Sequence, residues 1–262
     1  MTMKSLVNIT DPVKQVVVED QFWKKYKHIV ANEVIPYQWK ALNDELPDTE
    51  PSHAIENFRI AAGESSGEYY GTVFQDSDVA KWLETVAFSL RDFPNKELEK
   101  KADEVIALLG RAQGKDGYLN TYYMLKEPNN RWTNLRDNHE LYCAGHFIEA
   151  AVAYYESTGK KEFLHIMEKY VDLIDSVFGL EEGKIKGYPG HEEIELALVK
   201  LFDVTNNQKH VKLAQYFIEQ RGQQPIYFIE EMEKRNTIDT APTWNDDKNI
   251  NFSLGYEYQQ AH

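Results

Sequence analysis

The sequence has few of the features that would place it in a membrane, in an oxidising compartment or on a charged polymer. Its 262 residues include one cysteine, Cys143, so an intrachain disulfide and a multi-cysteine metal site are both excluded. No apolar run approaches the roughly 18 residues of a transmembrane helix, and the N-terminal MTMKSLVNITDPVKQ lacks the apolar core of a signal peptide. We therefore expect a soluble cytoplasmic protein.

Basic residues are also scarce: 29 lysines and arginines are outweighed by 43 aspartates and glutamates, and the formal net charge is −14. Such a chain repels polyanions, so nucleic acids and anionic membrane surfaces are not expected partners. The sequence contains no HExxH motif, no Gly-rich phosphate loop and no nucleophile elbow. The chemistry that each of these motifs performs is therefore not indicated.

What the sequence does contain is a repeated pair of amphipathic segments with apolar residues at helical spacing. The pairs occupy residues 78–113, 138–178 and 190–222, with a short turn inside each pair and long, polar, aromatic loops between pairs. Hairpins of this kind cannot bury their apolar faces alone, so they stack into a solenoid or close into a toroid. We predict an all-α fold in which the loops at one rim carry the function.

Two regions are predicted along the chain. Residues 1–20 form an extended segment with a short β-strand at Val13–Val18, and residues 21–262 form the helical domain. This domain begins with a helix that Pro36 ends or kinks, and together with the three hairpins it makes about half of a six-hairpin toroid. Such a half exposes two apolar edges, so a missing C-terminal half or a homo-oligomeric partner is expected to cover them.

Two histidines occupy equivalent positions at the starts of the second and third hairpins. His139 follows a long loop and opens the second hairpin, and His191 does the same in the third. An imidazole at that rim could donate a hydrogen bond to a substrate hydroxyl, although a helix-capping or interface histidine is the alternative. His146 lies two helical turns after His139, and we expect it to serve packing, like the small Cys143 in the same helix.

The first hairpin presents an amide and two carboxylates at the matching place. Gln75, Asp76 and Asp78 precede or open its first helix, where an acidic side chain is typical of an N-cap. The same carboxylates could bind hydroxyl groups or act as acid and base. A rim of this composition suits polyhydroxylated ligands better than phosphates or fatty acids. The loop after the hairpin adds aromatic residues that could stack on a sugar ring or belong to the core, namely Tyr118, Tyr122, Tyr123 and Trp132.

Seven motifs give a specific resemblance to a known family. In order along the chain they are VIPYQW, SHAIENFRIAAG, VFQDSDVAKWLE, RAQGKDGYLNTYY, NHELYCAGHFIEAAVAYYESTGK, FGLEEGKIKGYPGHEEIELALVKL and YFIEQRGQ. In this order, the motifs resemble the N-terminal half of the β-L-arabinofuranosidases of glycoside hydrolase family 127. The resemblance is collinear and runs from about residue 20 to the last residue.

The resemblance implies an (α/α)6 barrel and a retaining hydrolase that releases terminal β-L-arabinofuranose from arabinose-containing oligosaccharides or glycosides. In that family a zinc-bound cysteine thiolate is the nucleophile and a glutamate is the acid/base, while cysteines and a glutamate hold the zinc. Metal coordination keeps such a thiol ionised. These groups would all follow His262, so we expect no catalytic residue, metal ligand or cofactor in this chain, and no hydrolysis by it alone. Zinc is expected only in the full-length family.

The resemblance also assigns substrate-binding residues within this chain. His139 and His191 match the two histidines that bind the sugar from this half of the barrel. The pocket wall is expected at Gln75, Asp76, Asp78 and the loop around His53. One alternative is a sugar isomerase or epimerase on a related helical barrel, in which paired histidines act as acid and base. The other alternative is a non-catalytic helical scaffold whose exposed edges bind a protein.

Overall fold

The structure is a computed structural model that describes residues 18–236, and every regular element within this range is a helix. The all-α prediction is confirmed for these residues. The predicted strand at Val13–Val18 falls almost wholly outside them, as does the tail after Asn236. Within the described range, no helix combines the length and the apolar character that crossing a bilayer requires.

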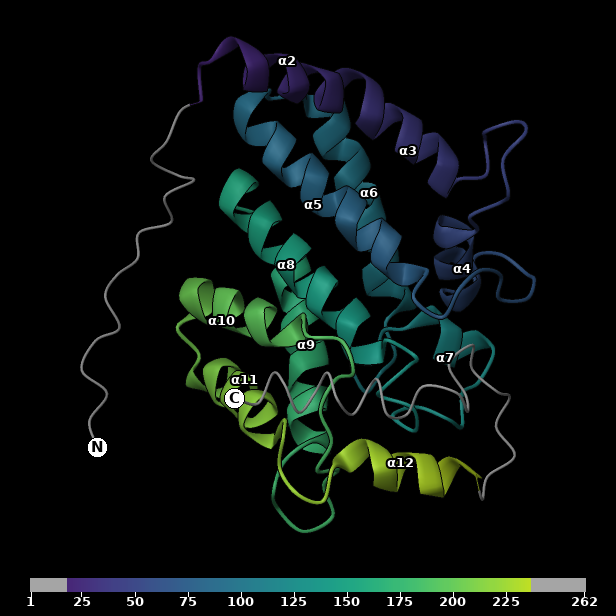
Figure 1. The fold of residues 1–262 in the computed structure, drawn as a ribbon. Coiled ribbons are helices and arrows are strands. Elements are labelled where there is room, and N and C mark those ends of the chain that lie inside the picture. The colour runs from purple at the N-terminus through teal and green to yellow at the C-terminus, as the bar shows by residue number, and fades with distance from the viewer. Residues whose placement is uncertain (1–17, 237–262) are drawn as a thin grey trace.

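The first helical run crosses one end of the molecule as α2 (Gln21–Ile29) and α3 (Ile35–Leu42), joined by the π-helical turn η1 (Val30–Val34) (Figure 1). The π-helical turn immediately precedes Pro36, whose missing N–H interrupts the α-helical bonding pattern. The helical run therefore continues through Pro36, with a π-helical turn in place of the regular α-helical pattern before it. It is anchored through Trp82, which donates from Nε1 to the carbonyl of Ile35 at 3.2 Å.

Three helical hairpins follow, as predicted. Their helices are α5 (Asp76–Asp92) with α6 (Lys96–Ala112), α8 (Glu140–Thr158) with α9 (Glu162–Val177), and α10 (Ile194–Thr205) with α11 (Gln208–Gln220). The tight turns have local causes. Asn95 caps α6 by accepting from two backbone N–H groups, and Asn207 caps α11. Gly159 and Asn206 end the first helices of their hairpins in the left-handed conformation that these residue types tolerate.

The hairpins stack in two layers (Figure 1). The first helices of the three hairpins, α5, α8 and α10, lie side by side and run in the same direction, and the returning helices α6, α9 and α11 form the second layer. The apolar core lies between the layers. Since α5, α8 and α10 are parallel, their N-terminal ends share one rim. The short helices α4 (Ala54–Ala61), α7 (Thr121–Leu125) and α12 (Tyr227–Asn236) border the hairpins near that rim and below it.

Close contact between α8 and α10 depends on Gly145. A Cβ built at this residue would lie 2.6 Å from Cγ of Glu193 and 2.9 Å from the backbone nitrogen of Ile194. Gly145→Ala is therefore expected to lower the free energy of unfolding by about 1–3 kcal/mol, measured by urea denaturation. Gly110→Ala in α6 is the matched control, because its Cβ would meet only the flexible tip of Ile166. Unchanged stability of Gly145→Ala would contradict the close-packing argument.

Candidate functional site

The two predicted rim histidines lie together. His139 directly precedes α8 and His191 precedes α10 by three residues, and their ring centroids are 6.0 Å apart. The ring of Tyr142, one turn into α8, contacts both histidines at centroid distances of 5.3 and 4.7 Å. Phe74, at the start of α5, packs on His139 at 5.2 Å. Residues from three hairpins therefore meet at the shared rim.

The backbone and protonation state of His139 decide which hydrogen bond it can make. The residue adopts a left-handed conformation with φ 57°, which is uncommon outside glycine and turns the side chain onto the carbonyl of Asp137. Nδ1 lies 2.5 Å from that carbonyl oxygen, which can only accept, so Nδ1 carries the proton. Partial burial and neighbouring His191 lower the pKa of His139, which favours the neutral ring. Nε2 therefore presents a lone pair that can accept a hydrogen bond, and it is not the donor that the sequence suggested.

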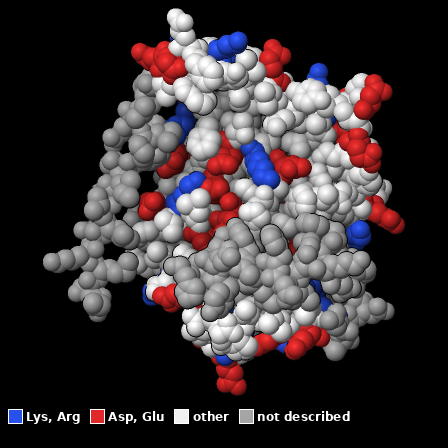
Figure 2. Space-filling model, in the orientation of Figure 1, with Lys and Arg blue, Asp and Glu red and all other residues white. Residues whose placement is uncertain are grey.

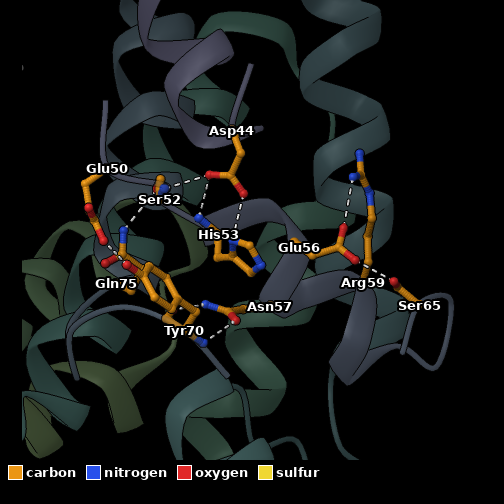
Figure 3. Close-up of polar contacts among 10 residues, drawn as sticks. All are labelled: Asp44, Glu50, Ser52, His53, Glu56, Asn57, Arg59, Ser65, Tyr70 and Gln75. Carbon is orange, nitrogen blue, oxygen red and sulfur yellow. Dashed lines mark hydrogen bonds and ion pairs between the residues drawn. The ribbon is translucent and has the colours of Figure 1, made fainter. Parts of the chain in front are cut away.

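His53 lies at the start of α4 in a loop that Asp44 organises (Figure 3). One carboxylate oxygen of Asp44 accepts from the backbone nitrogens of Ser52 at 2.6 Å and His53 at 2.9 Å. The other oxygen lies 2.7 Å from Nδ1 of His53. The ring of Tyr70 packs against the imidazole at 5.2 Å. These contacts hold a half-exposed imidazole at a fixed place in the loop.

Gln75 connects this loop to the N-terminal end of α5 (Figure 3). Its amide nitrogen donates to Oγ of Ser52 at 3.1 Å and to Oδ2 of Asp78 at 3.3 Å, and its Oε1 accepts from the backbone nitrogen of Thr72 at 3.2 Å. The predicted set His53, Gln75 and Asp78 is therefore connected through direct contacts and shared neighbours.

Asp76 departs from the prediction. It is 2% exposed, and its carboxylate accepts from the backbone nitrogen of Thr121 at 2.7 Å and from the Thr121 hydroxyl. Burial raises the pKa of Asp76 to about 6. The N-cap expectation is wrong, because α5 begins at Asp76 itself and no side chain caps it. Asp76 faces α7 and fastens it to α5, so its carboxylate is turned into the protein.

The aromatic loop between α6 and α8 is mainly core. Tyr118, Tyr122 and Tyr123 are between 0% and 8% exposed, which contradicts the idea that they stack on a ligand. Glu140, fully buried at the start of α8, accepts from the backbone nitrogen of Trp132 at 2.7 Å and from the Tyr118 hydroxyl. Burial raises the pKa of Glu140 to about 8. This carboxyl fixes the loop that leads to the rim, a role that sequence reasoning missed.

Further residues extend the site along α8. The ring of Tyr142 lies edge-on to that of His146, with 4.4 Å between centroids, and Nζ of Lys81 lies 5.3 Å from the centre of the Tyr142 ring. The spacing of His139, Tyr142 and His146, three and then four residues apart, could have identified this row from the sequence. Cys143, in the same helix, is fully buried as expected, and burial raises the pKa of its thiol well above the usual range.

Stacked helical hairpins that present imidazole, amide and carboxylate groups at one rim define a helical domain suited to a hydroxyl-rich ligand. The sequence profile of the family described as "Beta-L-arabinofuranosidase, GH127 catalytic domain" matches residues 15–258. The chain belongs to this family of glycoside hydrolase catalytic domains, and the resemblance found in the motifs is confirmed.

Individual relatives agree with this assignment. The chain is 42% identical over 237 residues to a non-reducing end β-L-arabinofuranosidase of Bifidobacterium longum subsp. longum, covering 84% of this chain and 36% of the relative. A solved GH127 β-L-arabinofuranosidase from Geobacillus stearothermophilus T6 superposes with a TM-score of 0.84 at 68% identity, over 88% of this chain and 36% of that one. A second solved structure, a GH127 β-arabinofuranosidase, superposes with a TM-score of 0.73 at 35% identity, and the match covers 80% of this chain and 33% of that one. The chain thus spans about a third of these relatives.

Proposed function

We propose that the rim binds the terminal β-L-arabinofuranose of a glycoside or oligosaccharide through His139 and His191. The observation that carries this proposal is that two imidazoles from separate hairpins lie with ring centroids 6.0 Å apart. His53, Gln75 and Asp78 form the adjoining wall. The name of the Bifidobacterium relative supports the choice of sugar. Family membership favours a glycosidase over the isomerase and scaffold alternatives.

The proposed architecture is the N-terminal part of an (α/α)6 barrel comprising residues 21–262. The exposed side of α5 and α10 supports a covering partner, since Phe88, Leu196 and Val199 are 43%, 55% and 38% exposed. Figure 2 shows acidic and basic side chains gathered in the middle of the same view, with neutral residues around them. We propose that the remainder of the catalytic domain, or a second copy of the chain, covers this side.

The zinc-thiolate chemistry of the family does not fit the residues of this chain. A thiolate ligand needs an exposed or metal-facing sulfur with a lowered pKa, whereas Cys143 is fully buried and its pKa is raised. Zinc at this cysteine therefore has no part in the proposed function. In the proposed function, the rim residues bind and orient the sugar, while the nucleophile and the acid/base are not among these residues.

The purified 262-residue chain is therefore expected to release p-nitrophenol from p-nitrophenyl β-L-arabinofuranoside no faster than spontaneous hydrolysis in buffer does. The physical reason is that the described residues of the rim supply hydrogen-bonding groups without an activated nucleophile. The assay is absorbance of released p-nitrophenolate, and a longer family member serves as the positive control. Turnover by the chain that persists through repurification and is abolished in Cys143→Ser would contradict the proposal.

A further inference from the structure

A second cluster of functional groups lies between α8 and α10, two helical turns along α8 from His139. His146 and Glu149 are three residues apart and share one face of α8, and Glu193 comes from the segment that leads into α10. Each offers one metal-ligand atom, and in the described part of the chain these atoms all lie within 4.8 Å of one another. They come from two hairpins, so the tertiary fold assembles the cluster.

The packing holds the three side chains in place. Because residue 145 is glycine, Glu193 can lie directly against α8, where a Cβ would be 2.6 Å from its Cγ. Only 15% of the His146 side chain, 13% of that of Glu193 and 9% of that of Glu149 is exposed. The edge-on ring of Tyr142 fixes the plane of the His146 imidazole. The groups are therefore preorganised and largely withdrawn from water.

Two ligand atoms in the cluster are buried without a hydrogen bond. Nδ1 of His146 and Oε1 of Glu193 lie 3.4 Å apart, which is an ion pair only when the ring is protonated, and neither atom has a hydrogen-bond partner. Buried polar atoms in folded proteins are almost always satisfied, so two adjacent exceptions need an explanation. A cation between them would supply the missing interaction, because with the His146 proton on Nε2 both atoms carry a lone pair.

The charges around the cluster also favour a cation. Glu149 and Glu193 are two carboxylates in one partly buried place, which is unfavourable when both are ionised. Lys200 pairs with Glu149 and so neutralises one of them. Lys81 and Glu84, both on α5, act on the cluster with opposite signs and offset each other. Burial and the hydrogen bond between Glu193 and Glu149 raise the pKa of Glu193 to about 8, so the two carboxyl groups share a proton that a divalent ion would displace.

We propose that His146, Glu149 and Glu193 bind a first-row divalent cation, Zn²⁺ before the others, that joins α8 to α10 below the rim. One imidazole nitrogen and two carboxylate oxygens are ligands that zinc takes in proteins, with water in the fourth position. Mg²⁺ and Ca²⁺ prefer all-oxygen sites, so the imidazole disfavours them. The donor set contains no thiolate, unlike the set that the family resemblance implies, and the proposal does not depend on sugar binding.

Isothermal titration calorimetry on chelator-treated, dialysed protein tests the site. We expect one equivalent of Zn²⁺ to bind and Ca²⁺ to produce no binding heat. Glu193→Gln, which keeps the side-chain volume, and His146→Gln should each weaken Zn²⁺ binding at least tenfold while the helical circular dichroism stays unchanged. Cys143→Ser and His165→Ala, a buried thiol and an exposed histidine of α9, should bind Zn²⁺ as the unchanged chain does.

Co²⁺ substitution gives an independent readout of the ligands. The expected spectrum has visible d–d bands without the thiolate-to-cobalt charge-transfer band that a cysteine ligand would add. Three results would overturn the proposal: no stoichiometric Zn²⁺ binding, which would leave Glu149 and Glu193 sharing a proton; undiminished binding in both Glu193→Gln and His146→Gln; or loss of binding in Cys143→Ser or His165→Ala.

Discussion

Replacing Glu140 by alanine is expected to lower the free energy of unfolding by about 2–5 kcal/mol. The carboxyl is fully buried and accepts from both the Trp132 backbone nitrogen and the Tyr118 hydroxyl. Truncation leaves two buried donors without acceptors, and each unsatisfied group costs about 1–3 kcal/mol.

Urea denaturation at pH 7 measures this effect. Glu140→Gln should lie between the parent and the alanine variant, because its amide keeps one acceptor but turns an NH₂ group towards the other donor. Glu104→Ala is the control: this glutamate lies on α6 with 67% of its side chain exposed, and its contact with Lys100 is 3.8 Å long. Its loss should stay below about 0.5 kcal/mol. Similar losses for Glu104→Ala and Glu140→Ala would show that Glu140 does not anchor the loop.

The hairpins were predictable because their signals are local. Helical spacing of apolar residues, the capping asparagines Asn95 and Asn207 and the glycine at 159 all act within a few residues of the elements they define. The change of helical pattern next to Pro36 follows from the same kind of reasoning. Periodicity also places His139 and His191 at the same rim, since both directly follow an inter-hairpin loop.

Side-chain direction was not predictable where a distant segment decides it. Asp76 has the sequence context of an N-cap, yet Thr121, 45 residues away, takes both of its oxygens. In the sequence, Tyr118 and Tyr123 resemble an aromatic ligand-binding surface. In the structure both are buried, and Tyr118 donates to Glu140 of α8. The approach of Glu193 to His146 depends on tertiary packing at Gly145, which no local pattern reports.

Replacing His139 or His191 by alanine is expected to weaken binding of methyl β-L-arabinofuranoside by the chain about tenfold or more. This follows from the proposed function, because losing one hydrogen bond to a sugar hydroxyl in the occupied site costs about 1–3 kcal/mol and 1.4 kcal/mol is a factor of ten in affinity. Isothermal titration calorimetry or saturation-transfer NMR gives the dissociation constants. The two substitutions act on adjacent rings, so their combined effect should be less than the sum of the single effects.

Two further variants separate hydrogen bonding from folding in this experiment. His139→Asn keeps a residue type that tolerates the left-handed backbone at φ 57°, so it should fold as the parent does and still lose affinity because it lacks Nε2. His165→Ala, on the exposed side of α9, should bind the sugar unchanged. If the parent chain shows no binding, or if both rim variants bind as tightly as the parent, His139 and His191 are not the sugar ligands in this chain. Loss of affinity in His139→Asn at unchanged thermal stability would show that the His139 imidazole itself, and not the fold of the rim, supports sugar binding.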